Sequence, residues 1–504
     1  MMPLDCINNE KFQDFCYDLN SRFQIPCTNT IKNKIMESVF YTRSTLKEMF
    51  QQTMISVCLT TDLWTHHHSS YIGVTAHWLT DDFKMYQSLI TIENFNYPHT
   101  GDRIEDFLRK ILIEWDISDK LMAVTTDNAS SMIKAIRQLN TIHLGCAAHS
   151  IHLAITDGLS KNKYLIEIAK SLNNFLVNYD KYRLKLRNIQ LKLSNNQILE
   201  PISSDTATRW NSTYFILKRL LELQPAIYEL AKSLMKDPNR GTHLDGNILK
   251  EKILNDNDWQ GLEELCELLN PFACASVFMG GSYYPTLSMM YPIMHRLFKH
   301  LNQMSLKLTH PSVIEIYQGL HESLLSRWED PNMIGWLSTI LDPRFKSLSS
   351  ASTSMRDSVI QELRRRVIQS SQLSNDTNEL IPMTSTMASF FEDDENSHSF
   401  SSVDNELQIY FSIPQIPKYE INDPLYTKHN PLIWWAEHQK ALPLLAKQAR
   451  IFLNIPATSV PSERLFFDAG NVLTDKRNRL NANTVHDLLF LKENSYIINV
   501  YPGL

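Results

Sequence analysis

A change of side-chain periodicity near residue 55 constrains the fold of this chain more than any other feature. Residues 55–61, 71–79 and 83–92 are rich in β-branched and aromatic side chains and alternate in polarity, which predicts three β-strands. Residues 80–82, between the last two segments, are short and polar, so those two strands are expected to form a hairpin. A fourth strand is predicted at residues 121–126. The N-terminal part of the chain therefore predicts an α/β sheet.

Helical patterns separate and follow these strands. Residues 101–115 and 128–139 carry apolar residues at helical spacing, and residues 142–157 change from a strand-like to a helical pattern. Three antiparallel strands followed by a helix, a strand and another helix describe a sheet of the ribonuclease H type. That analogy concerns the fold and not the function.

The chain divides into five segments by composition and pattern. Residues 1–50 predict a helical N-terminal segment, and residues 51–158 predict the first part of the sheet-containing core. Residues 159–368 are almost entirely helical in pattern and predict a large all-α insertion. Residues 369–403 are rich in Ser, Asn and acidic residues, which predicts a flexible linker. Residues 404–497 return to helical patterns.

Composition excludes several classes of protein. The 504 residues are 43% apolar with 13 glycines, which favours a helix-rich globular protein of several domains. The net charge of -6 is not the basic charge typical of proteins that bind nucleic acid over a large surface. DNA contacts must therefore come from local basic patches or another partner. The seven cysteines include no C-x2-C pair, so we expect no structural zinc and a reducing compartment. We see no leader and no apolar run of about 18 residues, which predicts no membrane span.

Three carboxylates are candidates for a metal site. Asp62 and Asp127 each follow a Thr-Thr pair at the end of a predicted strand, where side chains of adjacent strands can converge. Carboxylate clusters bind Mg²⁺ ions, and two such ions support phosphoryl transfer on nucleic acid. Glu463 lies on a predicted helix that starts near Pro461 and Ser462. Each residue also has a structural interpretation, since acidic residues cap loops and helix N-termini, and spacing alone does not decide between the two.

A basic stretch and an Arg-Trp pair are candidates for DNA binding. Lys181, Arg183, Lys185 and Arg187 alternate with aromatic and apolar residues and could follow a phosphate backbone, although a solvated helix face has the same pattern. Arg209 could bind a phosphate and the adjacent Trp210 could stack on an unpaired base, although a helix start with a buried Trp has the same sequence.

Cys146 and His149 stand one helical turn apart on a predicted helix. This spacing occurs in zinc sites, but zinc requires four ligands and the sequence contains no obvious second pair. We therefore favour a packing or supporting role beside a site over a metal-binding role.

Taken together, the motifs of the chain resemble the hAT transposase superfamily, in the branch of zinc finger BED domain-containing and plant RICESLEEPER-like proteins. The motifs that carry the resemblance occur in the family's order along nearly the whole chain: TTDLWT (60–65), YIGVTAHWL (71–79), TTDNASSM (125–132), CAAHSIHL (146–153), TRWNSTY (208–214), YPTLS (284–288), LDPRFK (341–346), NPLIWW (430–435), and ATSVPSERLFFDAG with KRNRLN (457–481).

The resemblance implies a ribonuclease H-like core interrupted by a helical domain and a C-terminal dimerisation region at 404–497. It implies a catalytic triad at Asp62, Asp127 and Glu463, with Mg²⁺ or Mn²⁺ as cofactor if the protein is active. Trp210 matches a tryptophan that stacks near a flipped base at the cleaved transposon end. Cys146 matches the first position of a C-x2-H motif beside the active site, and His149 the second.

The resemblance also implies partners and a location. We expect a nuclear protein that binds DNA, at transposon ends, and associates with itself through a face that includes Leu465, Phe466, Leu488 and Leu489. The BED zinc finger of such proteins is not apparent, because the N-terminal cysteines lack the required spacing and His partners. The alternative is a non-catalytic, domesticated or decayed copy that dimerises and binds DNA or regulatory partners without cutting.

Overall fold

The computed structural model divides the chain into two compact units. It describes residues 4–66, 69–178, 180–193, 198–203, 210–328, 332–375, 392–418, 429–472 and 482–497. The α/β unit comprises Met1–Ala147, Met279–Tyr291 and Asn332–Leu504, and the helical unit comprises Ala148–Phe278 and Pro292–Pro331. No helix in these described ranges is both long enough and apolar enough to cross a membrane.

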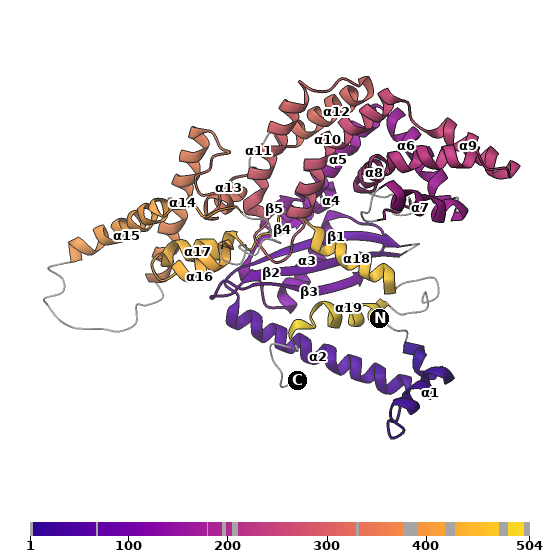
Figure 1. Cartoon of the computed structure of the whole chain (residues 1–504). Coiled ribbons are helices and arrows are strands. Elements are labelled where there is room, and N and C mark those ends of the chain that lie inside the picture. The colour runs from indigo at the N-terminus through magenta and orange to yellow at the C-terminus, as the bar shows by residue number, and fades with distance from the viewer. Residues whose placement is uncertain are drawn as a thin grey trace. The chain divides into compact units, whose positions relative to one another are not determined.

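The α/β unit is built on a five-stranded mixed sheet with the order β3-β2-β1-β4-β5 (Figure 1). Its strands are β1 (Val57–His66), β2 (Ser69–Leu79), β3 (Met85–Asn94), β4 (Leu121–Thr126) and β5 (Ile142–Gly145). β1, β2 and β3 pair antiparallel, whereas β4 pairs parallel to both β1 and β5. The predicted ribonuclease H type of sheet is confirmed.

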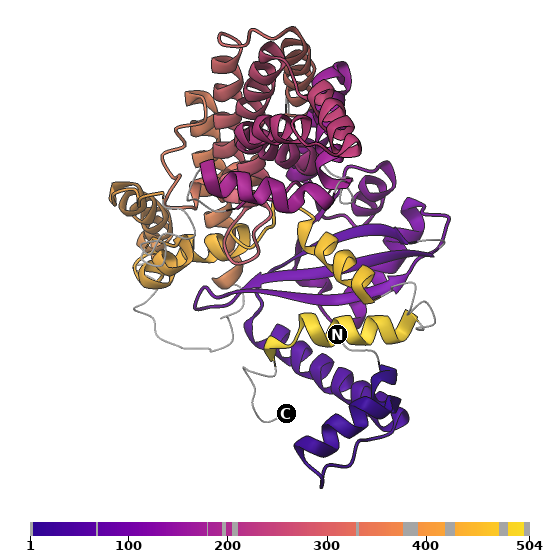
Figure 2. The ribbon, with the colours of Figure 1, turned by 45° about the vertical axis from the view of Figure 1, so that its right-hand side comes forward.

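Helices of the α/β unit cover the sheet and extend beyond it. Their bounds are α1 (Glu10–Leu19), α2 (Thr28–Thr53), α3 (Gly101–Glu114), α4 (Ser130–Gln138), α13 (Met333–Ile340), α14 (Thr353–Asn375), α15 (Glu392–Ser412), α16 (Pro431–His438), α17 (Pro443–Phe452), α18 (Val460–Val472) and α19 (Ala482–Glu493). α18 packs on β1 and β2, and α19 lies beside β3 and α2 (Figures 1 and 2). The last two helices therefore complete the core begun by the first strands.

Alternation along β2 separates the two faces of the sheet. Trp78 points to the face that packs on α2, where its ring lies 4.9 Å from that of Phe50. Gly73 points to the opposite face, where a Cβ atom would lie 3.2 Å from the Phe466 ring of α18. A side chain at position 73 would require the Phe466 ring to shift by a few tenths of an ångström, so the glycine permits this close approach.

Eight described helices lie wholly or mainly in the helical unit. They are α5 (Ala147–Lys161), α6 (Tyr164–Asn178), α7 (Arg183–Leu193), α8 (Trp210–Met235), α9 (Arg240–Lys252), α10 (Asp256–Met279), α11 (Leu287–Met304) and α12 (Pro311–Trp328). Three of them (α5, α10 and α11) share residues with the α/β unit. Gly158 lets α5 approach α12 closely, because a Cβ there would lie 2.9 Å from the carbonyl oxygen of Ile316.

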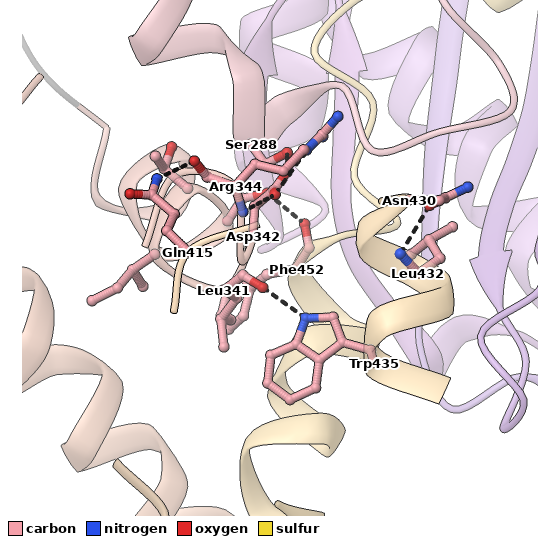
Figure 3. Close-up of polar contacts among 12 residues, drawn as sticks. Ser288, Leu341, Asp342, Arg344, Gln415, Asn430, Leu432, Trp435 and Phe452 are labelled. Atoms are coloured by element: carbon pink, nitrogen blue, oxygen red, sulfur yellow. Dashed lines mark hydrogen bonds and ion pairs between the residues drawn. The ribbon is translucent and has the colours of Figure 1, made fainter. Parts of the chain in front are cut away.

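A buried polar hub in the α/β unit accounts for the LDPRFK and NPLIWW motifs. The Asp342 carboxylate forms an ion pair with Arg344 at 2.7 Å and accepts a hydrogen bond from Ser288 at 2.7 Å (Figure 3). The Trp435 indole N–H donates to the carbonyl oxygen of Leu341 at 2.7 Å. These bonds join α16 and the segment that follows α13 to residues 279–291, so the motifs serve the fold of this unit.

Two segment boundaries differ from the sequence prediction. Residues 279–291 and those from 332 onward belong to the α/β unit, whereas we expected the helical insertion to run from 159 to 368. The ends of the predicted linker at 369–403 lie in α14 and α15, and its central residues 376–391 fall outside the described residues. Polar composition alone did not distinguish a solvated helix from a linker.

Candidate active site

Asp62 and Asp127 occupy equivalent positions on adjacent parallel strands. Thr60 of β1 is paired with Thr125 of β4, and each aspartate lies two residues further along its strand direction. Residues separated by two project from the same face, and neighbouring strands lie about 4.8 Å apart. Both aspartates are half-buried. The strand register therefore brings Asp62, on β1, level with the point where the chain leaves the adjacent strand β4 at Asp127.

Glu463 is brought to the same face by the first turn of α18. The hydroxyl of Ser462 lies 2.6 Å from that of Thr60, two residues before Asp62 on β1. Asp62 is paired with Gly73, the residue against which Phe466 packs. α18 thus lies over the strands beside Asp62, and Glu463 is half-buried at the start of this helix.

The segment that leads into α18, residues 454–462, is held along the ends of the strands; we call it the strap. The thiol of Cys58 donates to the side-chain carbonyl of Asn454 at 3.1 Å. The hydroxyl of Thr125 donates to the carbonyl oxygen of Pro456 at 2.9 Å. The strap therefore contacts β1 and β4, the strands that lead to the two aspartates, before the chain reaches Glu463.

Each aspartate accepts a backbone hydrogen bond close to its own position. Oδ1 of Asp62 accepts from the N–H of Leu63 at 2.8 Å, and Oδ1 of Asp127 accepts from the N–H of Ala129 at 3.2 Å. Within the described ranges, no three His, Cys, Asp or Glu side chains are gathered closely enough to hold a metal ion. Three carboxylates suit Mg²⁺ or Mn²⁺ by chemistry. In the structure the side chains of Asp62, Asp127 and Glu463 are not gathered into such a site, so they would have to turn toward one another to form it.

Sequence reasoning missed His143, which lies beside Asp127. Its Nε2 is 2.9 Å from the hydroxyl of Thr126. Burial lowers the pKa of His143, and the charge of Asp127 opposes that shift. The imidazole is therefore neutral at pH 7 and does not compete as a cation for the carboxylate. A lone His in a short strand gave no signal that could have identified it.

Cys146 fixes the strap in place. Its buried sulfur accepts a hydrogen bond from the backbone N–H of Ser459 at 3.3 Å. The next residue, Ala147, donates its N–H to the carbonyl oxygen of Ala457 at 3.0 Å. These contacts agree with the supporting role we favoured for Cys146. His149 is half-buried in α5, where its ring lies 6.4 Å from that of His152.

Three of the four residues expected at a dimer face lie inside the α/β unit. Leu465, Phe466 and Leu489 are 1%, 6% and 0% exposed, and Leu488 is half-buried against the same core. The ring of Phe466 stacks on Trp64 with 5.6 Å between centroids. The apolar faces of α18 and α19 therefore pack on the sheet of their own chain, which differs from the expected exposed face.

The four basic residues of the stretch from Lys181 to Arg187 are all paired within the chain. The ion pairs are Lys181 with Asp245, Arg183 with Asp180 and Glu200, Lys185 with Asp237, and Arg187 with Glu200. This arrangement neutralises the stretch locally and is typical of a solvated helix face.

Trp210 is buried at the start of α8. Its side chain is 6% exposed, and its ring lies 6.3 Å from that of Tyr214. Stacking on a base would require this side chain to become accessible. Arg209 lies outside the described residues.

Comparison with protein families matches three parts of the chain. Residues 60–149 match the ZBED1 RNase-like domain, and residues 144–268 match the ZBED1 RNase-like helical domain. Residues 406–495 match the hAT family C-terminal dimerisation region. The matches follow the order expected from the motifs.

Curated relatives cover nearly the whole chain at low identity. A protein named AC transposase in Zea mays is 25% identical over 97% of this chain and 63% of its own length. Zinc finger BED domain-containing protein RICESLEEPER 3 of Oryza sativa is 22% identical over 97% of the chain and 68% of its own length. A protein named transcriptional regulator tpeD in Talaromyces stipitatus is 24% identical over 92% of the chain and 56% of its own length. The chain thus spans about three fifths of the length of the transposase it matches.

Proposed function

Since the chain belongs to the hAT transposase family, we propose that it is a nuclear DNA-processing protein that associates with itself and cuts DNA at an Asp-Asp-Glu site. Asp62, Asp127 and Glu463 form that site in this proposal. The DNA would be the ends of the element that encodes the protein.

The observation that carries the proposal is the register of the two aspartates beneath α18. Asp62 and Asp127 each follow by two residues a member of the Thr60–Thr125 pair of β1 and β4, and the Ser462–Thr60 contact of 2.6 Å holds the first turn of α18 on β1. A purely structural cap at each position would not need Asp62 and Asp127 to follow paired residues of two adjacent strands.

The three carboxylates would hold Mg²⁺ or Mn²⁺ ions once Asp62 and Asp127 turn away from the backbone amides they now contact. Such ions, when bound, activate the attacking oxygen and stabilise the leaving oxygen of a phosphodiester. The protein's own contribution is to hold three anionic side chains at one site and to keep His143 neutral beside Asp127.

A nicking assay tests the proposal. The substrate is a closed circular plasmid that carries the terminal repeats flanking the gene, incubated with Mg²⁺ or Mn²⁺. We expect nicking by the native protein and a loss of at least about 1,000-fold in Glu463→Gln, because the variant keeps the shape of the side chain and loses a charged metal ligand. Asp468→Asn is the matched control and should keep activity, because Asp468 lies five residues further along α18, where it pairs with Lys492.

Equal nicking by native protein and Glu463→Gln would reject the catalytic site. No nicking by native protein that is folded and self-associated would reject cleavage.

A non-catalytic function is the second candidate, and the pairing of the basic side chains favours it. The four Lys and Arg residues of the 181–187 stretch are all engaged with acidic residues of the chain. One relative is also named a transcriptional regulator. In this case the protein would associate with itself and bind regulatory partners or DNA without cutting, and Glu463→Gln would leave that binding unchanged.

A further inference from the structure

We infer that a buried chain of hydrogen-bonded side chains, from His77 through Thr75 and Thr60 to Ser462, sets the position of Glu463 relative to Asp62. Thr60 and Ser462 are positioning residues in this inference, which rests on the proposed function. To the proposed function it adds the side chains of β1 and β2 that would hold Glu463, the third carboxylate, in place.

The four side chains are linked without interruption across the sheet. Nε2 of His77 lies 2.8 Å from the hydroxyl of Thr75, which lies 2.5 Å from the hydroxyl of Thr60. The hydroxyl of Thr60 lies 2.6 Å from that of Ser462 in α18. His77 is 6% exposed and the three hydroxyl residues are fully buried. The chain of contacts therefore runs from β2 through β1 into α18.

The stability of the sheet does not by itself require these hydroxyls. Thr and Val have nearly the same shape, and burying a hydroxyl is unfavourable unless it is hydrogen-bonded. A run of apolar side chains at positions 60 and 75 would fill the same space. A fully connected polar chain has a second effect, which is to specify one arrangement of the elements it joins.

In this protein the chain of hydroxyl contacts specifies where the first turn of α18 lies on β1. Leu465 and Phe466 also hold this helix on the sheet, but apolar packing is not directional. The Ser462 hydroxyl bond is directional, and Ser462 directly precedes Glu463. Rotation or sliding of the helix would break the bond to Thr60, and the same movement would displace Glu463 from Asp62.

The burial of His77 keeps this chain of contacts uncharged. Desolvation lowers the pKa of His77 to about 3, so the ring is neutral near pH 7. A neutral ring can serve as either a donor or an acceptor toward Thr75 without placing a cation in the sheet.

The test compares the same substitution at two adjacent positions of β1. Thr60→Val removes the hydroxyl that contacts Ser462, and Thr60→Ser keeps it. Thr61→Val is the matched control, because Thr61 is equally buried, faces the other side of the sheet, and has a hydroxyl with no hydrogen-bond partner. Three quantities are measured: amide hydrogen exchange over 459–466, Mn²⁺ affinity by electron paramagnetic resonance, and kcat and KM for nicking.

We expect Thr60→Val to speed hydrogen exchange at the start of α18, to weaken Mn²⁺ binding about 10-fold or more, and to lower kcat by a similar factor with KM for DNA unchanged. Thr60→Ser and Thr61→Val should resemble the native protein. A general loss of packing would affect both Val variants and would not be rescued by Thr60→Ser.

Two results overturn the inference in distinguishable ways. If Thr60→Val matches Thr61→Val in exchange and Mn²⁺ affinity, the hydroxyl chain does not position Glu463, even where the native protein nicks DNA. If exchange rises in Thr60→Val while native protein and Glu463→Gln bind Mn²⁺ equally weakly and neither nicks, the proposed function fails, and the hydroxyl chain serves the fold alone.

Discussion

At the scale of single residues, Glu406 shows how a buried carboxylate can complete a helix. Its side chain accepts hydrogen bonds from the N–H groups of Leu444 and Leu445, in the first turn of α17, at 3.0–3.2 Å. The residue directly before that helix, Leu442, provides no side-chain cap. Glu406 thus performs from α15 the role that a neighbouring Ser or Asp performs in most helices.

Burial raises the pKa of Glu406 above its ordinary value of 4.5, and the two N–H groups oppose that shift. Between pH 4.5 and the pKa of the folded state, Glu406 is therefore still protonated in the folded chain but already ionised in the unfolded chain. The stability from this proton is fully present below pH 4.5 and is lost as pH rises through the folded pKa. Glu406→Gln can accept the same bonds and does not titrate. We expect the free energy of unfolding of the native protein, relative to Glu406→Gln, to decrease from pH 4.5 to neutrality in urea titrations. A difference independent of pH would contradict this.

At the scale of elements, the sequence predicted the strands well and the partners of the last helices poorly. β1 to β4 follow from alternating and β-branched patterns, which depend on neighbouring residues only. The apolar faces of α18 and α19 show that each helix is buried against something. Helical periodicity is the same whether that surface is the chain's own sheet or a second molecule. The structure decides for the sheet, since Leu465 and Phe466 lie in its core.

The start of α18 also shows that the sequence pattern does not reveal which distant residues a helix will contact. Pro461 and Ser462 suggested that the helix would begin at these residues. The helix begins at Val460, where the N–H groups of Ser462 and Glu463 bond to the carbonyl oxygen of Ser459. The hydroxyl of Ser462 is thereby available to Thr60, 402 residues away in sequence. Local preferences cannot indicate a partner at that distance, so the contact between the start of α18 and β1 could be expected from the family resemblance alone.

Packing of α19 on β3 can be tested with two adjacent leucines. Leu489 is fully buried and Leu488 is half-buried. We expect Leu489→Ala to lower the free energy of unfolding by about 2–5 kcal/mol, because it leaves a cavity in the core. Leu488→Ala, the control, should have a clearly smaller effect. Equal effects in urea denaturation would show that α19 does not pack on the sheet as described.

At the scale of the whole molecule, the core of the α/β unit is complete only when the C-terminal helices pack on the N-terminal sheet. The five strands end at Gly145, whereas α18 and α19, which pack on β1, β2 and β3, begin only at Val460. The C-terminal dimerisation match at 406–495 includes those helices. A surface for self-association must therefore be sought among residues of this region that the sheet does not bury.

Ile433 of α16 is such a residue, since it lies within the matched region and is 40% exposed. A second copy of the chain is the partner implied by the match, and a charge at an apolar interface is unfavourable. We expect Ile433→Asp to weaken self-association by about 2 kcal/mol, roughly 30-fold in Kd, without loss of folding. Ile113→Asp is the control, because Ile113 is 67% exposed on α3, outside the match. Light scattering over a concentration series measures both. If Ile113→Asp weakens association as much as Ile433→Asp does, the surface is not specific to the matched region; if neither changes it, association occurs elsewhere.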